Sequence, residues 1–164
     1  MSVFKKIVSS LTGESTEEKE PVQMFRRNGL YFKNVPSKGR GVFCTEDIKE
    51  GELIEVTPLM VFNEADALHI YRTQLKDYAF SATGMPIPPA PMEQPQRQDQ
   101  SKATCVSMGI TSFCNHLVDP NADKIWMGDD LALYTALKAI KDIPAGDEIC
   151  INYGIAWMAL HKKM

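Results

Sequence analysis

The sequence predicts a mainly β protein that folds as a single domain. From residue 28 onward, short runs rich in β-branched and aromatic residues follow one another, separated by turns that contain glycine or proline. A chain of 164 residues is about the size of one domain, and its 44% hydrophobic residues can form a core. A second domain with a separate cofactor fold is therefore not expected.

Three early runs and one late run are predicted as strands. They cover residues 29–35, 41–45, 52–62 and 149–153. Between the third and fourth runs, Asn63 has the side chain of a helix N-cap, and Leu68, Tyr71 and Leu75 repeat at helical spacing. We expect one helix from Asn63 to about Lys76.

Residues 131–140 are ambiguous. Leu133, Leu137 and Ile140 fit one face of a helix as well as a buried strand. Periodicity alone favours the helix, and a turn over residues 141–148 follows it.

Two segments differ from the rest of the chain. Residues 1–22 predict a short amphipathic helix and an acidic tether, with apolar positions at Val3, Phe4, Ile7, Val8 and Leu11. We favour a frayed arm or a helix that packs on its own domain; the alternative is an element that docks on a partner or a membrane surface. Residues 84–101 are rich in proline and glutamine and predict an inserted surface loop, either idle or a lid beside the substrate. The domain is expected to span residues 23–157, followed by a tail, 158–164.

Charge and cysteine content narrow the classes of function. The net charge of −3 gives no overall attraction to a phosphate backbone, so nucleic acid is not expected as a direct partner. The four cysteines are scattered without a CxxC pair, which favours an intracellular protein. The sequence contains no apolar run of the roughly twenty residues that span a bilayer, so we expect a soluble protein with no membrane partner.

Common catalytic motifs are absent from the sequence. Gly39-Arg40-Gly41 is a GxG, but no third glycine follows at the right distance, which excludes a Rossmann-type dinucleotide site. A GxG alone most often marks a tight turn or a close approach of the backbone. Cys114, His116 and Asp119 lie close together, but their spacing is not that of a known zinc site, and we expect no metal.

Three segments resemble, in order and spacing, the signature segments of SET-domain protein lysine methyltransferases. They are Gly39-Arg40-Gly41-Val42-Phe43, Asn115-His116 with Pro120-Asn121, and residues 143–154, which contain Gly146-Asp147-Glu148 and end in Tyr153-Gly154. Each is weak alone, and together they are specific. The resemblance covers residues 28–157 and looks closest to minimal stand-alone SET proteins such as those of large algal DNA viruses, which share a segment like residues 75–81.

This resemblance implies a SET-type β-clip fold. Small curved sheets, a short inserted helix and a pseudoknot-like crossing would bring the Asn115-His116 segment beside the strand that leads to Tyr153. Residues 131–140 would then form a strand, against the periodicity. S-adenosyl-L-methionine would bind on one face, and a substrate lysine would enter through a channel from the opposite face.

The resemblance also assigns site residues. Tyr153 would be catalytic, and Tyr78 and Ile151 would line the substrate channel. The residues that would bind the cofactor are Lys38, Gly39, Arg40, Gly41, Asn115, His116, Tyr153 and Trp157. Other readings stay open: Tyr78 as a half-buried aromatic, Trp157 as a core anchor, and the Asn115 and His116 side chains as supports of the chain crossing.

The chemistry explains why a tyrosine suits this position. A substrate lysine must lose a proton before it attacks, at a cost of roughly 4 to 5 kcal/mol at pH 7. A narrow apolar channel lowers that cost by desolvating the ammonium, and a neighbouring sulfonium lowers it further by repulsion. The Tyr153 hydroxyl would then orient the amine, and no strong base is needed.

The expected partner is a protein that presents a lysine, with a histone tail as the family's common target. Scattered acidic residues in the C-terminal half could attract a basic peptide. Because no cysteine cluster follows the domain to complete the channel, we also consider a homodimer. Leu117, Val118 and Ile151 depart from the family pattern, which keeps open an alternative, a catalytically silent module that binds a peptide or the cofactor. A structural protein that uses the 84–101 loop for contacts is a third reading.

Overall fold

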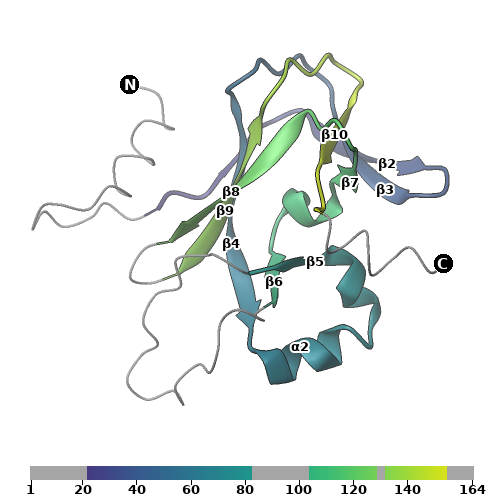
Figure 1. The fold of residues 1–164 in the computed structure, drawn as a ribbon. Helices are drawn as coiled ribbons and strands as arrows, with labels where there is room; N and C mark the ends of the chain where they lie inside the picture. Colours follow the sequence, from purple (N-terminus) through teal and green to yellow (C-terminus); the bar gives the residue numbers. More distant parts are fainter. Residues whose placement is uncertain (1–21, 83–103, 129–131, 155–164) are drawn as a thin grey trace, which may run out of the picture.

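Most of the chain forms two curved β-sheets. The computed structural model describes residues 22–82, 104–128 and 132–154, and the statements below refer to these residues. The larger sheet has the strand order β5-β6-β4-β9-β8, with β1 beside β4, and the smaller has the order β2-β3-β10-β7. Figure 1 shows the β2–β3 hairpin and helix α2 at opposite ends of the molecule. The mainly β fold is confirmed.

The elements have the following bounds. The larger sheet contains β1 (Phe25–Arg26), β4 (Leu53–Phe62), β5 (Ala79–Ser81), β6 (Thr104–Ser107), β8 (Ala122–Gly128) and β9 (Leu133–Ala139). The smaller contains β2 (Leu30–Val35), β3 (Gly39–Cys44), β7 (Asn115–His116) and β10 (Glu148–Ile151). The helical elements are α2 (Glu64–Ile70) and the 3-10 helices η1 (Gln74–Tyr78) and η3 (Ile110–Phe113).

The predicted helix over residues 63–76 is wrong in length and in its buried face. Its N-cap is confirmed, because the Asn63 side chain accepts a hydrogen bond from the backbone of Asp66. The Thr73 hydroxyl, however, donates to the Ile70 carbonyl and accepts from the Leu75 N–H, so it ends α2 and begins η1. The expected apolar face points outward, with Leu68 60% exposed, while Ile70 is buried.

Residues 133–139 form strand β9, as the family resemblance implies and against the helical periodicity. Strand β9 lies between β4 and β8 in the larger sheet. Leu133, Leu137 and Ala136 are all buried, although Ala136 and Leu137 are neighbours that point to opposite faces. Apolar and polar residues do not alternate along a central strand that is covered on both faces. The spacing of apolar residues alone therefore predicted a helix here.

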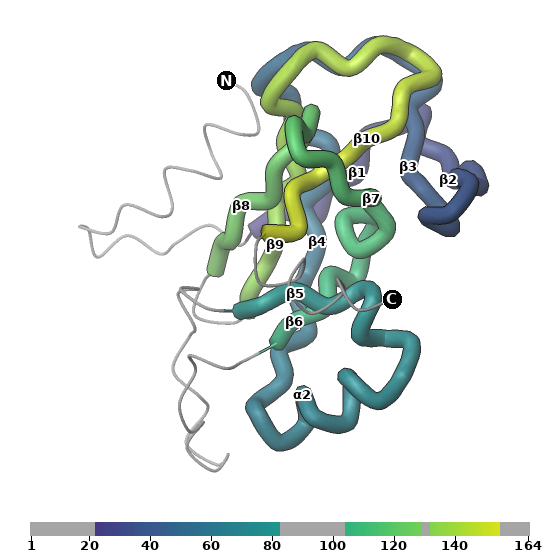
Figure 2. The backbone as a smooth tube through the Cα atoms, turned by 45° about the vertical axis from the view of Figure 1, so that its right-hand side comes forward, coloured from purple at the N-terminus to yellow at the C-terminus, as the bar shows by residue number. Residues whose placement is uncertain are grey.

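The main core fills the space between the two sheets. Its largest fully buried side chains include Ile48, Ile54, Leu137, Ile143 and Ile149. The crossing of the chain is visible in Figure 2, where the Asn115–His116 segment runs beside the strand that precedes Tyr153. This core therefore holds the segments that the resemblance assigns to the site.

All four cysteines are free and buried, and we expect them to be unreactive in the folded protein. Burial raises the pKa of Cys105 to about 12 and that of Cys150 to about 11, and it also raises the pKa of Cys44 and Cys114. At neutral pH almost no thiolate is present to attack a reagent. A chromogenic thiol reagent should label none of the four in the native protein and all four after unfolding; rapid native labelling would contradict this burial.

Several predicted features lie outside the described residues: the N-terminal helix and tether of residues 1–22, the 84–101 loop, Trp157 and the 158–164 tail. Among the helices of the part that the structure describes, none has the length and apolar character needed to cross a bilayer.

Candidate active site

The candidate site is built on the parallel pair of strands β7 and β10. Asn115 pairs with Cys150 and His116 with Ile151. The Asn121 side chain adds two bonds, donating to the Glu148 carbonyl and accepting from the Cys150 N–H, both at 2.8 Å. The predicted approach of the Asn115–His116 segment to the Tyr153 strand is confirmed.

Tyr153 follows this strand pair, and hydrogen bonds hold both its side chain and its backbone. Its hydroxyl donates to the Cys114 carbonyl at 2.8 Å, and its backbone N–H donates to His116 Nδ1 at 3.2 Å. The His116 and Tyr153 rings are 5.4 Å apart. Burial, followed by the nearby Cys114 and Cys150 thiols, raises the pKa of the Tyr153 phenol well above 10. The hydroxyl is therefore a fixed neutral group near pH 7.

Gly41 lets two side chains meet next to β3. Asn115 Nδ2 donates to Glu148 Oε1 at 2.6 Å, and a Cβ atom on Gly41 would overlap both side chains. The close approach expected at this glycine thus occurs, and it is to Glu148 and Asn115. Gly39, in contrast, has a φ of 81° and a Cβ there would touch nothing within 4 Å, so it serves the hairpin turn.

Replacing Gly41 with Ala should lower the free energy of unfolding by about 1 to 3 kcal/mol, the usual cost of overpacking. The added methyl group must displace the Glu148 carboxylate and so disturb its hydrogen bond with Asn115. Thermal or urea unfolding measures the loss. As a control, Gly39→Asn removes a glycine where no neighbour lies close and where Asn tolerates the positive φ, so it should cost less; equal losses in the two variants would contradict the overlap.

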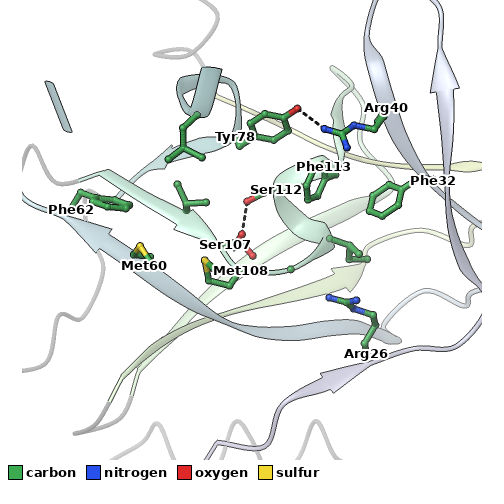
Figure 3. Close-up of a pocket in the computed structure, with 14 residues that line it drawn as sticks. Arg26, Phe32, Arg40, Met60, Phe62, Tyr78, Ser107, Met108, Ser112 and Phe113 are labelled. Carbon is green, nitrogen blue, oxygen red and sulfur yellow. Dashed lines mark hydrogen bonds between the residues drawn. The ribbon is translucent and has the colours of Figure 1, made fainter. Parts of the chain in front are cut away.

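A cavity of about 610 Å³ opens on the other side of η3. Figure 3 shows Arg40, Tyr78, Phe113 and Phe32 along one side of it, with Met60, Phe62 and Met108 on the other. One side of the lining is a cluster of a cation and aromatic rings, and the other is an apolar wall. The volume of the cavity lies in the range of small-molecule sites.

The cation and the rings of this cavity contact one another directly. Arg40 Nη2 donates to the Tyr78 hydroxyl at 3.1 Å, and the Arg40 guanidinium lies 5.2 Å from the centre of the Phe113 ring. The Tyr78 and Phe32 rings each lie 5.2 Å from the Phe113 ring. Three segments far apart in sequence, β2–β3, η1 and η3, therefore converge here.

The candidate residues thus fall into two groups that the Phe113–Cys114 segment joins. Phe113 lines the cavity, and the carbonyl of the next residue holds the Tyr153 hydroxyl. Of the predicted residues, Arg40 and Tyr78 lie at the cavity. The group around Tyr153 contains Gly41, Asn115, His116 and Lys38, whose Nζ donates to the His116 carbonyl at 3.5 Å.

Two predicted channel residues have surroundings that the sequence did not indicate. Tyr78 contacts Arg40, one of the residues predicted to bind the cofactor, at the cavity. Ile151 is fully buried in the main core cluster, where Tyr153 packs against it from the edge. Their roles toward a substrate stay predictions.

Glu55 on β4 is a site residue that the sequence analysis missed. Its carboxylate is 1% exposed and accepts hydrogen bonds from the Ile110 N–H, the Thr111 N–H and the Thr111 hydroxyl at 3.0 to 3.1 Å. Arg26 pairs with the same carboxylate at 2.9 Å, and a Cβ on Gly109 would overlap it. Glu55 therefore fixes the start of η3, the element that carries Phe113 toward the cavity.

Phe32, Phe113, Asn121 and Glu148 were also missed as site residues. Asn121 and Glu148 lie inside the motif segments, so their position was a usable signal. Phe32, Phe113 and Glu55 carried no local signal, because their roles arise from partners distant in sequence.

The three residues considered as metal ligands already form hydrogen bonds or an ion pair within the protein. Cys114 Sγ donates to the Ile110 carbonyl, His116 Nδ1 accepts from Tyr153, and Asp119 forms an ion pair with Lys141. Within the described ranges, no group of three or more His, Cys, Asp or Glu side chains could hold a metal ion.

The comparisons with known proteins agree with this geometry. The family model for the SET domain matches residues 39–154. A histone-lysine N-methyltransferase of Schizosaccharomyces pombe, specific for H3 lysine 37, is 26% identical over 129 residues, covering 78% of this chain and 75% of that protein. A shorter match of 44 residues, 46% identical, links 27% of this chain to 10% of the chicken protein-lysine N-trimethyltransferase SMYD5.

Two solved structures share the fold. The Neurospora SET-domain protein DIM-5, a histone lysine methyltransferase, has a TM-score of 0.57 and 25% identity, over 76% of this chain and 52% of that one. A Plasmodium falciparum protein described as a candidate histone methyltransferase has a TM-score of 0.56 and 21% identity, over 80% and 98%. The chain belongs to the SET-domain family, since the family model matches most of its length.

Proposed function

We propose that this chain is a protein-lysine N-methyltransferase that uses S-adenosyl-L-methionine. One observation carries the proposal: neighbouring residues connect a cavity of small-molecule size, which Phe113 lines, to a half-buried, neutral tyrosine hydroxyl, which the Cys114 carbonyl holds. A cofactor on one side and an acceptor amine on the other would meet at these two residues. The lysine methyltransferases among the relatives support the same activity.

The cavity residues fit the chemistry of this cofactor, which when bound supplies an electrophilic methyl group on a sulfonium. The Arg40 guanidinium is the cation that would pair with the carboxylate of its amino-acid part. The Tyr78, Phe113 and Phe32 rings offer faces for the sulfonium and for the adenine. Met60, Phe62 and Met108 form an apolar wall that would contact the rest of the cofactor.

Tyr153 would act on the acceptor amine. Because its proton is donated to the Cys114 carbonyl, the Tyr153 hydroxyl would meet the substrate amine as an acceptor, through a lone pair of its oxygen. Its raised pKa keeps it from serving as a base, so the amine must lose its proton to water before it attacks. The tyrosine therefore positions the amine lone pair, a contribution through orientation.

The substrate we propose is a basic protein segment such as a histone tail. The histone specificity of the S. pombe relative and of DIM-5 supports this class. The exposed carboxylates of Asp123 and Asp147 would favour a basic peptide over an acidic one. The silent binding module is the alternative that the following experiment separates from this proposal, and the homodimer stays a prediction.

The proposal is tested in two steps on the full chain. Calorimetric titration with S-adenosyl-L-methionine should give saturable binding, weakened about tenfold or more in Arg40→Ala because a charged hydrogen bond is worth about 1.5 to 3 kcal/mol. Incubation with the methyl-labelled cofactor and a histone pool should then label protein. Binding without any labelling of histones or of a cell-protein pool would favour the silent module, and absence of both would overturn the proposal.

A further inference from the structure

Lys124 on β8 holds its amine at the backbone of the residue that precedes Tyr153. Its Nζ donates to the Asn152 carbonyl at 3.1 Å, and Asn152 directly precedes Tyr153. This bond joins β8 to the chain just after β10. The chain therefore places one of its own lysine amines at the end of the strand that carries the candidate catalytic group.

Two aromatic rings and a carbonyl form a cradle around this amine. Nζ lies 5.4 Å from the centre of the Phe80 ring and 5.9 Å from that of Trp126. Lys124 and Trp126 are two residues apart on β8 and so point to the same face, where Phe80 of β5 packs against the Trp126 ring edge to face. Phe80 also packs against the core cluster that Tyr153 contacts.

Such a cradle suits a lysine amine in either a methylated or an unmethylated form. Aromatic faces attract ammonium and methylammonium groups through the cation–π interaction. Burial in this cradle lowers the pKa of Lys124 below the usual 10.5, although Asp123 and Cys105 nearby oppose the shift. A larger fraction of the amine is thus neutral, and only a neutral amine can act as a nucleophile.

We propose that Lys124 is a methyl acceptor of this protein, modified at its own active site. The inference rests on the proposed methyltransferase function and adds an acceptor within the chain to it. It is carried by the contact of Nζ with the Asn152 carbonyl next to Tyr153 and by the rings of Phe80 and Trp126.

The step balances with the cofactor as the methyl donor. Nζ first releases a proton to water. Its lone pair then forms a bond to the methyl carbon while the bond from that carbon to the sulfonium sulfur breaks, and sulfur keeps the electron pair. The products are methyllysine at position 124 and the neutral thioether form of the cofactor. No oxidant or reductant is required.

Peptide mapping by mass spectrometry after incubation of the intact chain with labelled cofactor tests this directly. We expect labelled methyl groups on Lys124 and none in a Tyr153→Phe chain treated alike. Lys33 is a matched control within the same digest, because its Nζ also lies over a ring, at 5.2 Å from the centre of Phe43, but on strand β2, which is not paired with β10. Equal labelling of Lys33 and Lys124 would indicate non-enzymatic methylation and overturn the inference.

The same reaction also tests the proposed function, through the label on the histone. Labelled histone together with unmodified Lys124 would overturn the inference and leave the methyltransferase function standing. Absence of label from every protein would overturn the function itself. In the chain without cofactor, an NMR titration of the Lys124 side chain should give a midpoint below 10.5; an ordinary midpoint would contradict the buried cradle.

Discussion

Replacing Tyr153 with Phe should lower the rate of methyl transfer by roughly two to three orders of magnitude, the usual effect of removing one preorganised catalytic hydrogen-bonding group. The substitution removes only the hydroxyl, which is held at 2.8 Å from the Cys114 carbonyl. Without it, the acceptor amine loses the group that orients its lone pair. Single-turnover kinetics with saturating cofactor measure this loss in the chemical step.

The same variant should still bind the cofactor, because Tyr153, which the family resemblance places among the cofactor-binding residues, does not line the cavity where we propose that the cofactor binds. Calorimetric affinity within about threefold of wild type is therefore expected, a change well under 1.4 kcal/mol. Tyr31→Phe is a suitable control, since this tyrosine stacks on Phe43 in the β2–β3 hairpin and does not line the cavity. Near-normal turnover of Tyr153→Phe would show that the hydroxyl does not position the amine.

Replacing Glu55 with Ala should lower the free energy of unfolding by about 3 to 5 kcal/mol, the largest stability effect we expect at this site. The carboxylate is 1% exposed, and its loss leaves the buried N–H groups of Ile110 and Thr111 without an acceptor. Each unsatisfied buried donor costs about 1 to 3 kcal/mol. Denaturant unfolding, monitored by circular dichroism, measures the change.

Glu52→Ala provides the matched control for this loss. Glu52 pairs with Arg27 at 2.9 Å, the same distance as the pair of Glu55 with Arg26, but its side chain is 44% exposed. An exposed pair contributes about 0 to 1 kcal/mol, so this variant should unfold nearly like wild type. Similar losses in both variants would contradict the role of buried hydrogen bonds in holding η3.

The sequence predicted the elements whose pattern is local. Residues 30–35 and 53–62 read as strands because their β-prone residues lie between clear turn residues, and both are strands. The helix after Asn63 was predicted too long, because the Thr73 hydroxyl competes for backbone groups in a way that apolar spacing does not record. Strand β9 was misread by period because both of its faces are buried.

In the candidate site, too, residues with a local sequence pattern were found and residues defined by distant partners were missed. Tyr153 and the Asn115–His116 segment were found because they lie in motifs with fixed spacing, and the structure brings them together. Glu55 and Phe113 were missed, since the partners that define them lie far away in sequence: Glu55 holds Thr111 across 56 residues, and Phe113 contacts Phe32 edge to face. Only the three-dimensional arrangement reveals such pairs.

The most direct test of the central claim is to identify the amino acid that receives the methyl group. A histone pool incubated with the chain and methyl-labelled S-adenosyl-L-methionine is hydrolysed to amino acids, which are separated by chromatography. The account predicts that the label elutes with methylated lysine, and that Tyr153→Phe forms at least a hundredfold less of it. Label on another amino acid, or equal methyllysine from the variant, would contradict the account.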